Sequence, residues 1–278
     1  MAEAFPVTEG GERAKALWSS GDYPLIAERF EPVADDLLDA AGAIAGRRLL
    51  DVAAGTGNVA LAAARRGARV LATDLTPRMV ELGRARATAL GIEIEWKEAD
   101  AASLPVPDGS VDVVTSCFGL MFVTDPVAVI DELGRVLHPG GRLTMVNWEP
   151  GRASQRLFEP LRRRLPLPPG PASTDAADPV DPGDWGRSEV IEGWLGSAFT
   201  EVACTRRPFS WDFPTAGQAA DYFLSASPMH ACALAALPGE EHAAVRAEVE
   251  TMLSEFSTGG PVSVSSPYLL VTAVRAGS

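Results

Sequence analysis

The segment Leu49-Leu50-Asp51-Val52-Ala53-Ala54-Gly55-Thr56-Gly57-Asn58 consists of an apolar run, a glycine-rich turn and the start of a helical pattern. The two glycines allow a tight turn and let a ligand approach the backbone closely. From Arg47 to Trp148, short apolar stretches alternate with helix-compatible ones, which is typical of βαβ units around a parallel sheet. The quoted segment therefore predicts the first strand and the first helix of an α/β fold.

The rest of the chain is assigned from its apolar periodicity and its proline and glycine positions. In the central region we expect strands over Arg48–Ala54, Arg69–Asp74, Ile92–Ala99, Val111–Cys117 and Arg142–Trp148, with helices after Gly57, after Pro77 and over Pro126–Leu137. We expect the last of these helices to stop at His138-Pro139-Gly140-Gly141, because proline cannot continue a helix. Before this region we expect helices over Glu12–Trp18 and Tyr23–Ala41, the second interrupted at Pro32, and after it an irregular segment over Leu165–Trp185, strands over Phe199–Phe213 and Tyr268–Arg275, and helices within Thr215–Phe256.

Composition argues against several classes of protein. The net charge of -13 repels phosphate backbones and anionic lipid headgroups, so we expect neither nucleic acid nor a membrane as partner. No stretch reaches the ~18 apolar residues of a membrane span, and we expect a cytoplasmic protein that is a monomer or a homodimer. The cysteines, Cys117, Cys204 and Cys232, are widely spaced and predict neither a disulfide framework nor a metal site.

Asp51 separates two ligand classes. With Ala60, the glycine turn satisfies the Gly-x-Gly-x-x-Gly/Ala pattern of NAD-binding folds. An acid at the end of the first strand would face the pyrophosphate of a dinucleotide, whereas it would suit the sulfonium and ammonium groups of S-adenosylmethionine (SAM). We therefore favour SAM, with NAD as the weaker alternative. A purely structural role, in which Asp51 caps the glycine turn through its backbone amides, stays open.

Two more acids follow the next two strands. Asp74 ends the second strand, where it can accept hydrogen bonds from the ribose hydroxyls, or alternatively begin the helix at Thr76-Pro77. Asp100 follows the third strand and can accept from the adenine amino group, while the amide of Ala101 can donate to a ring nitrogen. Acids after three successive parallel strands are expected at one edge of the sheet, where open α/β folds bind ligands.

These residues, in order and spacing, resemble the class I SAM-dependent methyltransferases. The resemblance rests on Asp51 to Asn58, Asp74, Asp100 with Leu104-Pro105, Asp112-Val113-Val114 and Arg135-Val136-Leu137-His138-Pro139-Gly140-Gly141. The chain is most similar in appearance to the ubiquinone and menaquinone biosynthesis group and to bacterial natural-product methyltransferases. The clear match covers Arg47 to Trp148.

The resemblance implies a Rossmann-like fold: a mostly parallel seven-stranded sheet with helices on both faces and helical lid insertions. We expect one domain over residues 1–278. Its parts would be an N-terminal helical lid (1–46), the SAM-binding core (47–150), an irregular insertion (151–185), the completion of the sheet (186–213 and 264–278) and a helical lid over the acceptor site (214–263).

The resemblance also implies the cofactor contacts. Asp51, Ala53, Gly55 and Gly57 would line the methionine and ribose portion, Asp74 would hold the ribose, Asp100 and Ala101 would recognise adenine, and Cys117 would lie beside the transferred methyl group. The full set of implied SAM-binding residues is Trp18, Tyr23, Asp51, Ala53, Gly55, Thr56, Gly57, Asp74, Leu75, Met79, Asp100, Ala101, Cys117 and Phe118. Many members of the family carry glycine where this chain has Ala53, whose methyl group predicts an ordinary backbone conformation.

The chemistry requires little beyond alignment of the methyl group with a nucleophile and exclusion of water. His230, which lies in the predicted lid, and Tyr23 are selected as catalytic candidates, with a surface or core histidine as the alternative for His230. The full set of possible bases is His138, His230, His242, Tyr23, Tyr222 and Tyr268. We predict methyl transfer to an O, N or C atom of a small-molecule acceptor, in natural-product or secondary metabolism. The alternatives are a methyltransferase-fold enzyme with another reaction, such as cyclisation, and a non-catalytic SAM-binding regulator.

Overall fold

The computed structural model describes residues 11–151, 153–165, 181–257 and 259–277. The chain divides into two compact units. The first comprises residues 1–26, 151–179 and 208–267, and the second comprises residues 27–150, 180–207 and 268–278. In the described parts of the chain, no helix is long and apolar enough to cross a membrane.

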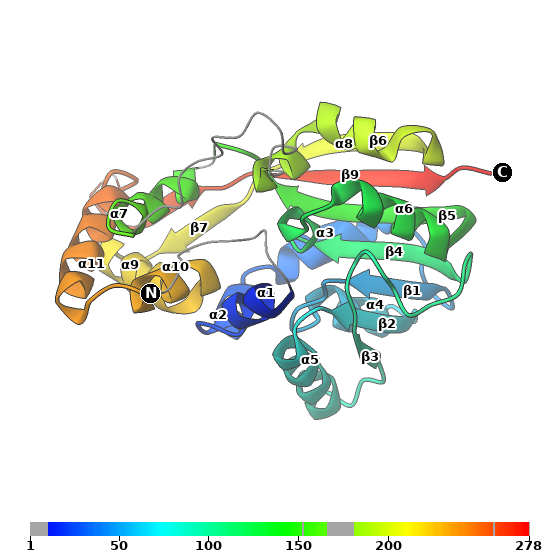
Figure 1. The fold of residues 1–278 in the computed structure, drawn as a ribbon, viewed down its shortest axis with the longest axis horizontal. Helices are drawn as coiled ribbons and strands as arrows, with labels where there is room; N and C mark the ends of the chain where they lie inside the picture. The colour runs from blue at the N-terminus through cyan, green and yellow to red at the C-terminus, as the bar shows by residue number, and fades with distance from the viewer. Residues whose placement is uncertain (1–10, 152, 166–180, 258, 278) are drawn as a thin grey trace. The chain divides into compact units, whose positions relative to one another are not determined.

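The second unit is built on a seven-stranded sheet. Its strands are β1 (Arg48–Val52), β2 (Arg69–Asp74), β3 (Glu95–Glu98), β4 (Val111–Cys117), β5 (Leu137–Trp148), β6 (Phe199–Arg207) and β9 (Tyr268–Arg275). They lie in the order β3-β2-β1-β4-β5-β9-β6 (Figure 1), with β1 to β5 parallel and β9 antiparallel to both of its neighbours. The expected mostly parallel, seven-stranded Rossmann-like sheet is confirmed.

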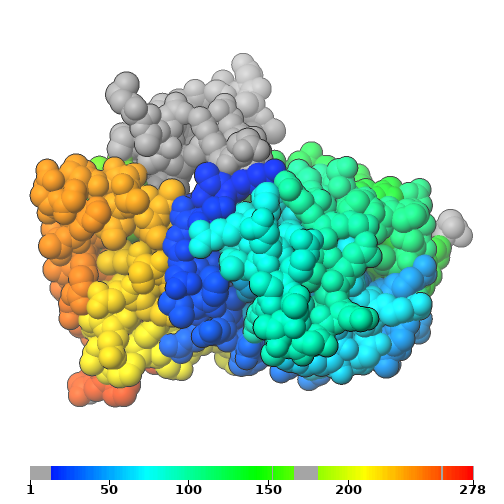
Figure 2. Space-filling view, turned by 90° about the horizontal axis from the view of Figure 1, so that it is seen from below, coloured from blue at the N-terminus to red at the C-terminus, as the bar shows by residue number. Residues whose placement is uncertain are grey.

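Helices cover both faces of this sheet. The main ones are α3 (Glu31–Ala41), α4 (Asn58–Arg65), α5 (Pro77–Ala89), α6 (Pro126–Val136) and α8 (Ser188–Leu195), with short 3-10 helices η1 (Leu120–Phe122), η3 (Pro182–Gly186) and η4 (Gly196–Ala198). Right-handed crossovers place α4 and α5 on one face and α6 on the other, because β2 and β3 lie on one side of β1 and β5 lies beyond β4 on the other side. In Figure 2 the side of α5 and β3, coloured cyan, faces the viewer, and β3 forms this edge of the sheet.

The first unit is mainly helical. It contains α1 (Gly11–Trp18), η2 (Ala153–Phe158), α7 (Glu159–Arg162), α9 (Ala216–Ala226), α10 (Pro228–Ala235), α11 (Gly239–Ser254) and a two-stranded antiparallel sheet of β7 (Ser210–Phe213) and β8 (Val262–Ser265). Its core is aromatic and aliphatic, with Trp211, Phe213, Phe223 and Val249 buried. The helix-rich segment expected within Thr215–Phe256 is confirmed. The helix α2 (Tyr23–Glu28) begins in this unit.

One predicted strand is wrong. A single strand was expected over Phe199–Phe213, but β6 ends at Arg207 and β7 belongs to the other sheet. Pro208 follows β6 directly and has no backbone N–H with which to continue the ladder. The chain is then free to leave the seven-stranded sheet and pair Ser210–Phe213 with Val262–Ser265.

Several boundaries also differ from those expected. The helix over Tyr23–Ala41 is split into α2 and α3, with Pro32 in the first turn of α3, where its missing N–H costs nothing. The strand β5 begins at Leu137 and runs through the expected proline-glycine turn, where its pairing with β4 shifts register. Of the expected irregular segment Leu165–Trp185, residues 166–180 lie outside the described residues.

Candidate functional site

The strand order fixes where a ligand crevice is expected. The strands β2 and β3 lie on one side of β1, while β4 and β5 lie on the other side. The order in which successive strands are added to the sheet therefore reverses between β1 and β4. In open α/β sheets, ligands bind outside the carboxyl ends of the strands at such a reversal. Asp51 near the end of β1, Asp74 at the end of β2 and Cys117 at the end of β4 all lie at this edge.

Asp74 holds the glycine turn. Its Oδ2 accepts a hydrogen bond from the Gly55 amide (2.8 Å), and its Oδ1 accepts one from the Thr76 amide (2.9 Å). Gly55 and Gly57 both adopt positive φ, 55° and 85°, as a tight glycine turn requires. The Thr76 hydroxyl is a third donor to this carboxylate. Three of its four lone pairs are then used, so the group can still accept one hydrogen bond from a ribose hydroxyl.

Asp51 binds the helix that follows the turn. Its Oδ2 accepts from the Ala60 amide in the first turn of α4 (3.1 Å), and its Oδ1 accepts from the Thr115 hydroxyl of β4 (2.9 Å). Asp51 therefore makes structural hydrogen bonds to the helix after the turn and to β4, while the Gly55 amide of the turn itself donates to Asp74. The residue is only 1% exposed, and burial, together with the nearby Asp74 carboxylate, raises the pKa of Asp51 to about 7.

The backbone of Ala53 differs from the expectation. Ala53 has a φ of 53°, so the prediction of an ordinary conformation is wrong. A Cβ atom at Gly119 would lie 2.3 Å from the Ala53 Cβ, so the absence of a side chain at Gly119 makes room for the alanine methyl. Phe118, next to Gly119, also has a positive φ of 61°. Two non-glycine residues beside the site, Ala53 and Phe118, are therefore in the left-handed region, at a cost of roughly 1–2 kcal/mol each.

An aromatic cluster continues the site along β4 and β5. Phe118 stacks on Trp148, with ring centroids 3.8 Å apart, and both rings contact Phe30 and Tyr268. The Tyr268 hydroxyl donates to Asp36 Oδ2 of α3 (2.7 Å), which also lies 3.2 Å from Nε of Arg207. Burial raises the pKa of Tyr268, so its hydroxyl keeps its proton.

Cys117 lies at the start of this cluster. Burial, with the neighbouring Asp51 carboxylate, raises the pKa of the Cys117 thiol well above its ordinary value. The thiol is therefore neutral and does not act as a nucleophile at physiological pH. We expect Cys117 to lie beside the transferred methyl group, and its neutral thiol would add no charge there.

The remaining predicted residues of the second unit follow the same edge. Met79 in the first turn of α5 and Thr56 in the glycine turn are buried, and Leu75 between β2 and α5 is half-buried. Asp100 is exposed, and its Oδ1 accepts from the Ala102 amide (2.9 Å), while Ala101 is half-buried. The second oxygen of Asp100 accepts no hydrogen bond within the described residues, which leaves it open to a ligand.

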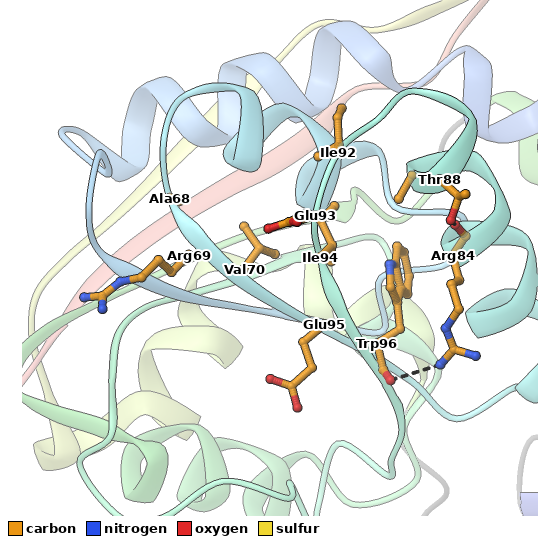
Figure 3. Close-up of a pocket in the computed structure, with 11 residues that line it drawn as sticks. Ala68, Arg69, Val70, Arg84, Thr88, Ile92, Glu93, Ile94, Glu95 and Trp96 are labelled. Carbon is orange, nitrogen blue, oxygen red and sulfur yellow. Dashed lines mark hydrogen bonds between the residues drawn. The ribbon is translucent and has the colours of Figure 1, made fainter.

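Trp96 of β3 supports the glycine turn from behind. A Cβ atom at Gly57 would lie 2.6 Å from the Trp96 Cη2, and one at Gly83 of α5 would lie 2.2 Å from the same atom. The indole also lines a pocket with Val70, Arg84 and Ile94 (Figure 3). This pocket lies at the amino ends of β2 and β3, and none of the predicted cofactor residues lines it.

Three predicted residues belong to the first unit. The rings of Trp18 and Tyr23 meet edge to face, 6.1 Å apart. His230 in α10 has its Nδ1 2.9 Å from the Ser227 hydroxyl and its ring against Phe158. Burial lowers the pKa of His230 to about 4, so its imidazole is neutral at physiological pH.

Sequence reasoning missed some of the supporting residues. Thr115, Asp36 and Gly119 were not singled out, although each fixes a site residue by a hydrogen bond or by leaving space. Thr115 lies two residues before Cys117, the last residue of β4. Because side chains alternate between the two faces of a strand, the sequence could have placed Thr115 on the same side as Cys117. The role of Gly119 depends on the conformation of Ala53, which the sequence does not reveal.

Comparison with known proteins shows what this chain is similar to. Residues 50–145 match the family described as the methyltransferase domain. An uncharacterized protein of Mycobacterium tuberculosis is 38% identical over 211 residues, which cover 75% of this chain and 74% of that protein. A demethylmenaquinone methyltransferase of Thermus thermophilus is 44% identical over 108 residues, 38% of this chain and 49% of that protein. The crystal structure of the YcgJ protein from Bacillus subtilis has a TM-score of 0.56 at 18% identity, over 88% of this chain and 98% of that chain.

Residues 50–145 carry a methyltransferase domain, and the chain has the fold of the class I SAM-dependent methyltransferases, the family that its sequence resembles. That resemblance implies SAM as the cofactor. The donor set of the site fits this cofactor. Asp51 and Asp74 are buried carboxyl groups, and in the described residues no arginine, lysine or histidine is hydrogen-bonded or ion-paired to either. Such a pair is complementary to a cationic ligand that lacks phosphate, which describes SAM better than a dinucleotide.

Proposed function

We propose that this protein transfers the methyl group of SAM to an O, N or C atom of a small-molecule acceptor in natural-product or secondary metabolism. The observation that carries the proposal is the convergence of Asp51, Asp74 and Asp100 on the carboxyl edge of β1, β2 and β3, beside the glycine turn. In this proposal Asp51 and the glycine turn face the methionine portion, Asp74 the ribose, and Asp100 with Ala101 the adenine.

The remaining residues of the site position the reactants. Bound SAM supplies an electrophilic methyl group on a sulfonium. The protein then has to align a nucleophile in line with that methyl group and exclude water. The Phe118 and Trp148 rings offer an apolar wall, and aromatic faces favour a neighbouring cation. The neutral thiol of Cys117 adds no competing nucleophile.

The acceptor is proposed from chemistry and from one relative. The similar protein of Thermus thermophilus is named a demethylmenaquinone methyltransferase, which makes demethylmenaquinone a first acceptor to test. The aromatic cluster favours flat, apolar acceptors over charged ones. Phenols and aromatic amines with one free O–H or N–H are the next compounds to test.

The test is an incubation with SAM labelled in its methyl group. The purified protein is mixed with each acceptor, and two products are measured: the label in the acceptor and S-adenosylhomocysteine (SAH). We expect both in equal amounts. Consumption of an acceptor without label transfer would instead show another reaction, such as cyclisation. Binding of SAM with no reaction across the acceptor panel would favour the regulator over the enzyme.

A further inference from the structure

Asp51 and Asp74 form a pair of buried acids without a counter-charge. They are 1% and 9% exposed, respectively, and each is hydrogen-bonded only to neutral donors. The two carboxyl groups repel each other when both are ionised, since each desolvated charge finds another negative charge nearby. The Asp74 charge therefore adds to the effect of burial, and both raise the pKa of Asp51.

The groups around Asp51 do not relieve this repulsion. From β4 it is faced by the neutral Cys117 thiol, and from α4 by the Ala60 amide. From the side of β3, Asp100 adds an exposed acid. The four acids of α3 are bound elsewhere. Glu31 pairs with Arg86, Asp35 and Asp39 pair with Arg66, and Asp36 binds Tyr268 and Arg207. In the described chain, no positive group contributes to the titration of Asp51 or Asp74.

We propose that SAM binding expels a proton from the Asp51–Asp74 pair. Because of this proton release, the affinity for SAM relative to SAH increases with pH. The inference rests on the proposed assignment of these two acids to the SAM site. SAM and SAH share the adenosine and the amino acid portion, and they differ by the methyl group and by the positive charge on sulfur. Asp51, an acid without a counter-charge that the proposal places beside the methionine portion, can respond to this difference in charge, whereas uncharged contacts to the shared adenosine cannot.

The direction and size of the effect follow from linkage. The free protein holds a proton on Asp51 up to a pKa of about 7, and a bound cation lowers that pKa. SAM affinity then rises with pH through neutrality and levels off above it. If the pKa falls by one unit, SAM affinity increases about sixfold between pH 5.5 and 7.5, and about half a proton is released near pH 6.5. SAH lacks the sulfonium charge, so its affinity changes less.

The experiment is titration calorimetry with SAM and with SAH across this pH range. Proton release is obtained by repeating each titration in buffers of different ionisation enthalpy. The ammonium group of the ligand also titrates, near pH 7.7–8.0 in general, so measurements stay below about pH 7.5. We expect the ratio of SAH to SAM dissociation constants to rise several-fold with pH, and proton release to be larger for SAM.

Three variants locate the proton. Asp51→Asn should make SAM affinity nearly independent of pH. Thr115→Val removes the hydroxyl that stabilises the ionised Asp51, so the midpoint of the pH dependence should move to higher pH. Thr144→Val is the matched control, because Thr144 pairs with Thr115 across β4 and β5, is fully buried, and has no hydrogen-bond partner for its hydroxyl among the described residues. It should leave the midpoint unchanged.

The outcomes separate the inference from the proposed function. A SAM-to-SAH preference that does not change with pH, or equal proton release for both ligands, would overturn the inference while leaving SAM binding intact. An equal shift in Thr115→Val and Thr144→Val would overturn it as well, even if Asp51→Asn does not fold. Failure of the parent protein to bind either ligand would instead contradict the proposed function.

Discussion

Replacing Gly83 by alanine tests the packing behind the glycine turn. The new Cβ atom would lie 2.2 Å from Cη2 and 2.4 Å from Cζ3 of Trp96. The indole cannot move away easily, since it is only 6% exposed and its Cη2 also occupies the space in front of Gly57. Overpacking of a well-packed site costs up to about 3 kcal/mol, and alanine in place of glycine inside a helix returns about 1 kcal/mol. We expect a net loss of about 2 kcal/mol.

The assay is urea unfolding followed by far-ultraviolet circular dichroism, with Gly193→Ala as the matched control. Gly193 lies inside α8, in the same compact unit, and no atom lies within 4 Å of an added Cβ. That variant should be more stable than the parent by up to about 1 kcal/mol. A Trp96→Leu background should remove most of the Gly83→Ala penalty, as a double-mutant cycle would show. If Gly83→Ala is as stable as Gly193→Ala, the contact with Trp96 is wrong.

Three further predictions concern the site and its protonation. Asp74→Ala should weaken SAM binding by about 2 kcal/mol in calorimetry, because a buried hydrogen-bonding group is lost; unchanged affinity in a folded variant would remove Asp74 from the site. The inosyl analogue of SAM should bind the parent much more weakly than SAM, because the Asp100 carboxylate cannot accept from a carbonyl oxygen; equal affinity would show that Asp100 does not read the base. Burial lowers the pKa of His230 from 6.5 to about 4. As the pH falls below 6.5, the unfolded chain therefore takes up a proton on this imidazole before the folded protein does, and the free energy of unfolding decreases. Relative to His230→Gln, the parent should lose about 2 kcal/mol of unfolding free energy between pH 7 and pH 5, and parallel curves would contradict the burial of this imidazole.

The strands that the sequence located best are those fixed by local pattern. The bounds of β2, β4 and β9 agree with the expected ranges, because each is an apolar run bounded by polar or turn-forming residues. The strands that it misplaced depend on distant partners. The segment Ser210–Phe213 pairs with Val262–Ser265, about fifty residues away in sequence, and no local feature of either segment specifies that pairing.

The start of β5 shows a different limit. The pattern His138-Pro139-Gly140-Gly141 favours a turn, and Gly140 does have a positive φ of 81°. The chain nevertheless remains extended on both sides of it, since Leu137 already pairs with Val111 of β4 and the ladder resumes at Arg142 after a register shift. Turn-forming residues thus produced an irregularity inside a strand and did not separate two elements.

For the acids at the strand ends, the sequence predicts the position of each residue better than its role. A parallel sheet brings the carboxyl ends of its strands to one edge, so a residue at a strand end can be placed from sequence alone. The role of that residue depends on the path of the loop that follows, and this path depends on a few contacts. Because Gly119 leaves room for the methyl group, Ala53 can take the left-handed conformation that glycine supplies in related loops. The turn then presents the Gly55 amide to Asp74 and leaves Asp51 to bind α4 and Thr115. A compensating glycine 66 positions away therefore preserves the loop that the alanine would otherwise be expected to alter.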